Sequence, residues 1–142
     1  MRVGIHRLRT DVQLPTYATS GSIGFDLHTA EEAAIMPGAI AIVGTGLVIA
    51  TPPGWGLLIC LRSSTPQRFG VIQPHGVGLI DQDYRGHGDE LRLQLMNYTV
   101  ADVTIPAGSC IAQGVFVPAQ QATWESWDPS DTNRGGFGST TH

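Results

Sequence analysis

The most apolar stretch of the sequence, residues 39–61, reads AIAIVGTGLVIATPPGWGLLICL. Gly44, Gly46 and the turn sequence Pro52-Pro53-Gly54 divide it into three short apolar runs. A membrane helix needs about 20 consecutive apolar residues, so these interruptions exclude one here. Short apolar runs between turn residues are typical of β-strands, and the glycines at residues 44–46 predict a hairpin between two of them.

Similar runs continue on both sides of this stretch. Strands are expected at residues 2–8, 25–27, 39–43, 47–50, 55–61, 71–73, 77–80, 91–96, 103–105 and 111–117. About ten short strands at this spacing predict an all-β sandwich or barrel. Helical signals are weak. One turn of helix is expected after Ser63-Ser64, where a cap residue precedes Pro66.

The composition narrows the class of protein. The 142 residues are the length of one domain. Lysine is absent, which excludes a Walker-type or Schiff-base lysine. The net charge of −4 argues against a broad basic face, so no nucleic-acid partner is expected. No secretory signal opens the chain and no membrane partner is indicated, so a cytoplasmic protein is expected.

Both cysteines, Cys60 and Cys110, lie in apolar runs. Neither belongs to a CxxC pair, and no histidine stands at metal-ligand spacing. We expect two buried free thiols rather than a disulfide or a metal site.

The end of the chain has a different character. Residues 120–142 are polar and rich in glycine, with Phe137 among the glycines. Such a segment buries too little apolar surface to fold alone. The sequence predicts a β domain over residues 1–119 and a flexible C-terminal arm over 120–142, which either frays or orders against another surface.

Two segments carry groups suited to chemistry on phosphates. The run at residues 77–80 ends at Asp81, whose carboxylate can deprotonate a water molecule or simply cap a tight turn. Arg62-Ser63-Ser64 offers a forked guanidinium and two hydroxyls, which suit phosphate oxygens; a helix cap beside an exposed arginine is the alternative.

Two polar residues interrupt predicted strands. Asp26 stands between Phe25 and Leu27, so alternation turns it away from them, toward solvent or a water-linked Mg2+. Gln113 places an amide in an apolar strand and needs hydrogen-bond partners if it is buried.

Taken in order, five segments resemble the five motifs of the trimeric deoxyuridine triphosphatase (dUTPase) family. They are residues 24–27, 62–64, 78–86, 111–113 and 134–140. The resemblance implies a jelly-roll-like distorted β-barrel and a homotrimer with active sites at subunit interfaces. It also implies Mg2+-assisted hydrolysis of dUTP to dUMP and pyrophosphate.

The third motif would carry the reacting groups. By resemblance, Asp81 would activate the water that attacks the α-phosphorus, and Tyr84 would pack on the deoxyribose. The strand backbone at Gly78 and Ile80 would read uracil, beside His75.

The other motifs would bind phosphates and close the site. By resemblance, Arg62, Ser63, Ser64 and Gln113 would hold phosphates or the attacking water, and Asp26 would hold a water of the Mg2+ shell. In the arm, Phe137 would stack on uracil in a neighbouring subunit. The γ-phosphate would be clamped by Arg134, Ser139 and Thr140, and Gly138 would also contact substrate.

The chain departs from the family pattern at four positions. Arg134 lies only three residues before Phe137. His75 stands where many members have asparagine, Cys110 where an arginine usually opens the fourth motif, and Thr141 where a glycine usually closes the fifth.

Two other functions compete with this interpretation. The related dCTP deaminases share the Arg-Ser-Ser segment but use a catalytic glutamate, and Gln94 stands at that position. A glutamine cannot shuttle the proton. A jelly-roll binding protein with nucleotide-binding remnants is the other alternative, and the presence of Asp81, Tyr84 and Phe137 argues against it.

Overall fold

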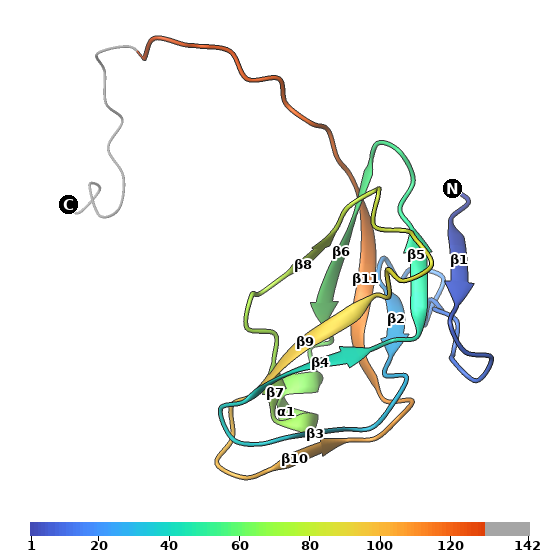
Figure 1. Ribbon diagram of the computed structural model, residues 1–142, viewed down its shortest axis with the longest axis vertical. Helices are drawn as coiled ribbons and strands as arrows, with labels where there is room; N and C mark the ends of the chain where they lie inside the picture. Colours follow the sequence, from blue (N-terminus) through green and yellow to red (C-terminus); the bar gives the residue numbers. More distant parts are fainter. Residues whose placement is uncertain (130–142) are drawn as a thin grey trace.

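Eleven β-strands and one short helix make up the part of the chain that the computed structural model describes, residues 1–129 (Figure 1). They are β1 (Gly4–Arg7), β2 (Phe25–His28), β3 (Ala33–Ile35), β4 (Ile40–Gly44), β5 (Leu47–Ala50), β6 (Trp55–Leu61), β7 (Val71–Ile72), β8 (Gly78–Ile80), β9 (Arg92–Asn97), β10 (Val103–Ile105) and β11 (Cys110–Pro118), with α1 (Thr65–Phe69) between β6 and β7. The predicted all-β class is confirmed. Only β3 had no counterpart among the expected strands.

The largest sheet has four antiparallel strands in the order β2-β11-β6-β8. Its inner face carries buried side chains such as Phe25, Leu27 and Ile59, which belong to one hydrophobic core. In the register of the sheet, Gln113 lies opposite Asp26 on one side and Cys60 on the other. Directly opposed residues share a face, so these three polar or thiol side chains form a row on the outer face.

The helix lies where the sequence predicts it. Ser64 occupies the position before its first residue, and a proline stands in its first turn. Gly70 ends it with φ 66°, a left-handed conformation that glycine adopts without strain, and its N–H donates to the carbonyl of Pro66. Among the described residues, no helix has the length and apolar character required to cross a bilayer.

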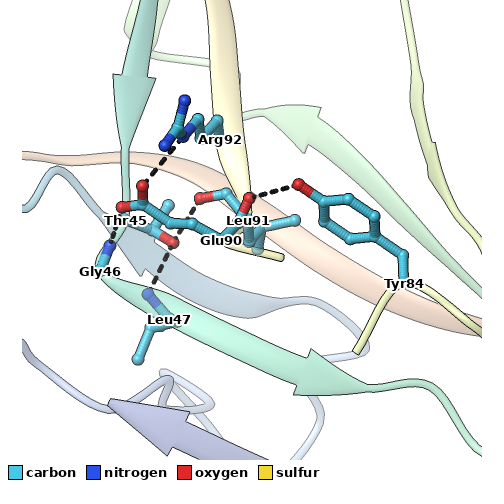
Figure 2. A network of polar contacts seen from close by, with 7 residues as sticks. All are labelled: Thr45, Gly46, Leu47, Tyr84, Glu90, Leu91 and Arg92. Carbon is cyan, nitrogen blue, oxygen red and sulfur yellow. Dashed lines mark hydrogen bonds and ion pairs between the residues drawn. The ribbon is translucent and has the colours of Figure 1, made fainter. Parts of the chain in front are cut away.

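The hairpin predicted at residues 44–46 is wrong. Strand β4 pairs with β9, and β5 pairs with β1, so the segment joins two different sheets. The buried Thr45 hydroxyl donates to the carbonyl of Leu91 (2.7 Å), and the Gly46 N–H donates to the carboxylate of Glu90 (2.8 Å) (Figure 2). These contacts with a distant part of the chain outweigh the local turn signal.

The cysteine prediction is correct in one respect and wrong in another. Cys60 and Cys110 are both free thiols, but each is only half-buried. Cys60 takes an outward-facing position by the alternation of β6, and Cys110 stands at the start of β11, where a bulge before Ala112 breaks the alternation.

The chain leaves the barrel after β11. Residues 119–129 are exposed and form no helix or strand (Figure 1). Two tryptophans in this segment have exposed side chains, Trp124 at 92% and Trp127 at 78%.

Asn97 ties the end of β3 and the loop after β9 to the last residue of β9. It is fully buried, and its Nδ2 donates to the carbonyls of Ile35 and Ala101, both at 2.8 Å. The variant Asn97→Ala leaves both carbonyls without this donor, so we expect the free energy of unfolding to fall by about 2–4 kcal/mol. Urea unfolding measures this fall. Val100→Ala, at a neighbouring exposed position, should change it by less than about 0.5 kcal/mol, and an equal effect in both variants would contradict the assignment.

Candidate active site

One group of predicted site residues gathers where β6 ends. The Arg62 Nε lies 3.5 Å from the carboxylate of Asp26, and its Nη1 donates to the Cys110 sulfur at 3.1 Å. Gln113 pairs with Asp26 across the sheet. We call Asp26, Arg62, Cys110 and Gln113 the Arg62 cluster. It presents one cation, one anion and an amide on the half-exposed outer face of the sheet.

Ser63 and Ser64 extend this cluster toward α1. Both are exposed, and the Ser64 side chain makes no capping hydrogen bond to the helix. Its hydroxyl therefore remains available to a ligand beside the guanidinium of Arg62.

Burial and charge set the ionisation of two neighbours of the cluster. Burial raises the pKa of the Cys110 thiol, an effect that Arg62 opposes and Asp26 reinforces. Burial also lowers the pKa of His28, while Asp26 acts in the opposite direction. At neutral pH the thiol and the imidazole are therefore uncharged. The charges of the cluster are those of Arg62 and Asp26.

A second group lies at the end of β8, as the sequence predicts. Asp81 follows the strand and is exposed, and it borders a cleft of about 630 Å³ together with Trp55, Leu79 and Ile80. A carboxylate in this open position reaches both water and a bound ligand. We call His75, Gly78, Ile80, Asp81 and Tyr84 the Asp81 edge.

Hydrogen bonds hold the loop that carries Tyr84. The Tyr84 hydroxyl donates to the backbone carbonyl of Glu90 at 2.9 Å, and the Glu90 carboxylate accepts hydrogen bonds from Gly46 N–H and Arg92 Nε (Figure 2). The ring of Tyr84 is therefore anchored at its far end, with 39% of the residue exposed. An anchored, exposed aromatic face suits packing against a ligand.

Gly78 stands in close contact with the side chains beside its strand. A Cβ at this position would lie 3.3 Å from the Ile59 side chain and 3.7 Å from the Nε2 of His75. A side chain at this position would press on Ile59, so glycine fits the packing here, next to His75.

The two groups do not meet within one chain. Ile80 pairs with Leu57 near the start of β6, whereas Arg62 follows the last residue of that strand. The residues from Leu57 to Arg62 span roughly 17 Å at about 3.3 Å per residue. In Figure 1, α1 marks one end of β6 and the departing arm marks the other. The expected residues thus form two separate half-sites.

The remaining predicted residues lie outside the described part of the chain. These are Arg134, Phe137, Gly138, Ser139 and Thr140. The structure adds two residues that sequence reasoning missed, Glu90 and Gln73. Glu90 supports Tyr84, and Gln73 contacts His75. Neither belongs to a recognisable pattern, because its role arises from contacts between separate segments.

An apolar hollow lies near β1. It has a volume of about 320 Å³ and is lined by residues near β1, such as Val3, Ile5 and Tyr17. It contains no residue of the Arg62 cluster or the Asp81 edge.

Substitution of the charged residues around Cys110 should change the pKa of its thiol. Because Arg62 lowers the pKa of the Cys110 thiol, Arg62→Met should raise that pKa. Asp26→Asn should lower it, since Asp26 raises it. In a Cys60→Ser background, the pH dependence of iodoacetamide alkylation measures both shifts. The helix variant Arg68→Met should leave the midpoint unchanged, and an unchanged midpoint in Arg62→Met would contradict the contact.

Comparisons with known proteins place the chain in a family. A family model described as dUTPase matches residues 10–141. A deoxyuridine 5'-triphosphate nucleotidohydrolase from Azotobacter vinelandii is 41% identical over 138 residues, which cover 93% of this chain and 89% of the relative. One from Helicobacter pylori is 34% identical over 143 residues, covering 99% and 97%.

Solved structures agree in fold. The crystal structure of a dUTPase from Streptococcus mutans has a TM-score of 0.77 and 34% identity, covering 85% of this chain and 99% of that one. A Staphylococcus bacteriophage 80alpha dUTPase has a TM-score of 0.86 at 19% identity, covering 97% of each chain, which shows likeness of fold alone. These matches confirm the jelly-roll-like barrel, and the family model and the bacterial relatives show that this chain belongs to the dUTPase family.

Proposed function

We propose that this protein hydrolyses dUTP to dUMP and pyrophosphate, with Mg2+, at sites formed between the subunits of a homotrimer. One observation carries the proposal. The chain holds two half-sites of complementary chemistry, one with a carboxylate, an aromatic ring and an open strand edge, the other with a guanidinium and hydroxyls. A nucleoside triphosphate needs both.

The Asp81 edge would bind the nucleoside and activate water. The backbone at Gly78 and Ile80 would hydrogen-bond the base beside His75, and the anchored ring of Tyr84 would pack on the deoxyribose. The Asp81 carboxylate would take a proton from a water whose oxygen bonds to the α-phosphorus. The bond from that phosphorus to the bridging oxygen then breaks, and pyrophosphate leaves.

The Arg62 cluster would hold the phosphates. Arg62 offers a forked donor for two phosphate oxygens, and Ser63, Ser64 and Gln113 add neutral donors that hold phosphates or the attacking water. Such groups act by positioning the substrate and neutralising charge, which phosphoryl transfer requires more than covalent catalysis. Cys110 and Asp26 hold the guanidinium in place.

The donor set fits a magnesium ion held mainly by substrate. Among residues 1–129, no group of three or more His, Cys, Asp or Glu side chains could hold a metal alone. Mg2+ usually binds one or two carboxylates together with phosphate oxygens and keeps several waters. Asp26, half-exposed beside Arg62, would hold one of those waters. When bound, the ion would neutralise charge on the triphosphate.

A row of apolar side chains on the outer face of the sheet supports assembly of several copies. Leu58 pairs with Val115 on one side and with Leu79 on the other, so the three side chains lie together on the outer face of the sheet. Leu79 is 64% exposed in the single chain. Burying this row against other copies would remove apolar surface from water and would join the half-sites of neighbouring subunits.

The arm would complete each site. By its motif, Phe137 would stack on uracil of a neighbouring subunit, and Arg134, Ser139 and Thr140 would clamp the γ-phosphate, with Gly138 beside them. These residues lie beyond the described part of the chain, so this role rests on the sequence alone.

Pyrophosphate release tests the reaction. With Mg2+, the wild type should cleave dUTP with a far higher kcat/KM than dCTP, dTTP or UTP. Asp81→Asn should reduce kcat by about a hundredfold to ten-thousandfold, because the base is lost. Asp102→Asn, at an exposed position outside both half-sites, should retain activity. Ammonia release from dCTP would instead indicate a deaminase, and dUTP binding without turnover would indicate a binding protein.

Mixed trimers test the shared site. Asp81→Asn and Arg62→Met chains should each be inactive alone. Co-refolded in equal amounts, they should recover about a quarter of the sites, because some interfaces then combine an intact Asp81 edge with an intact Arg62 cluster. Sedimentation confirms assembly. No recovery in properly assembled trimers would show that both half-sites must come from one chain.

A further inference from the structure

The contact with the Ile59 carbonyl sets the orientation of the Gln73 amide, and its Oε1 is buried without a partner among residues 1–129. Its Nε2 lies 3.2 Å from the backbone carbonyl oxygen of Ile59, in strand β6. A carbonyl oxygen only accepts hydrogen bonds, so the amide atom that faces it must be the nitrogen. The opposite orientation would place two acceptor oxygens in contact. The half-buried Gln73 is therefore fixed as a donor at this point.

The same nitrogen also fixes the ring of His75. The Gln73 Nε2 lies 3.2 Å from the Nε2 of His75. One of its two hydrogens is directed to Ile59, so the other is directed to the imidazole, whose Nε2 must then accept. In a neutral imidazole only one nitrogen carries the proton. The proton is therefore on Nδ1, and His75 is an exposed residue that offers one N–H donor to a ligand.

The ring of His75 stands beside β8, which is an edge strand of its sheet. A Cβ at Gly78 would lie 3.5 Å from Gln73 Nε2 and 3.7 Å from His75 Nε2, so the space left by glycine is bordered by this pair. A pyrimidine that approaches the backbone here would meet the ring of His75, whose N–H is on Nδ1. Uracil has a carbonyl oxygen at C4, whereas cytosine has an amino group there, and two donors that face each other repel.

We propose that Gln73 is a positioning residue for base selection: it holds His75 as the Nδ1–H tautomer, whose proton binds the C4 carbonyl oxygen of uracil and disfavours cytosine. The inference rests on the proposed function for the identity of the ligand. The tautomer itself does not depend on it. In the other tautomer Nδ1 would accept a hydrogen bond, which would favour the amino group of cytosine over the carbonyl oxygen of uracil.

Nitrogen-15 NMR of the imidazole measures the tautomer directly. At alkaline pH, the signals that disappear in His75→Asn identify His75, and their two-bond couplings show which nitrogen carries the proton. The wild type should be the Nδ1–H tautomer. Gln73→Glu should move the proton to Nε2, because a carboxylate accepts from that nitrogen. An Nε2–H tautomer in the wild type would overturn the proposal.

Selectivity is the second readout. The ratio of kcat/KM for dUTP over dCTP should fall about tenfold in Gln73→Glu, through a higher KM for dUTP with kcat little changed. Gln73→Met, which has no donor, should give an intermediate ratio, and the exposed helix variant Gln67→Met should match the wild type. An unchanged ratio in Gln73→Glu would refute the role in selection. If the wild type does not cleave dUTP, the proposed function fails, and the NMR result still decides the tautomer.

Discussion

The register of strand β6 is the constraint on which the site depends. One edge of β6 pairs with β8 near its start, and the other pairs with β11 along its length (Figure 1). The pairing with β8 fixes the position of Asp81, and the pairing with β11 places Gln113 close to Arg62. A shift of one residue would turn every side chain of β6 to the opposite face. It would put Cys60 in the core and Ile59 outside.

Local sequence patterns predicted the position of a side chain correctly where that position depends only on its own strand or turn. Alternation predicted that Asp26 faces away from Phe25 and Leu27, and their burial confirms it. The proline after Ser64 predicted the helix start. The pattern at residues 44–46 failed because a glycine turn serves a hairpin and a corner between sheets equally well. The deciding contacts, to Glu90 and Leu91, come from a distant segment.

The site divides in the same way. The residues proposed to contact substrate stand mostly in recognisable motifs, so the sequence could suggest them, and the structure shows that those within residues 1–129 form two groups. The residues that orient them do not stand in motifs. Gln73 acts on His75 through a carbonyl of another strand, and Glu90 supports Tyr84 through its own backbone. Such contacts depend on three-dimensional proximity and have no fixed spacing.

The Glu90 network has a consequence for protein engineering. The carboxylate of Glu90 holds the corner at Gly46, and its backbone holds the ring of Tyr84. Stabilising mutations often reduce activity because they stiffen parts of an enzyme that must move. Here the same residue braces the corner between two sheets and the ring of Tyr84 in the Asp81 edge. Substitutions around Glu90 should therefore change thermostability and catalytic activity in the same direction. Neither property can be raised at this corner at the expense of the other.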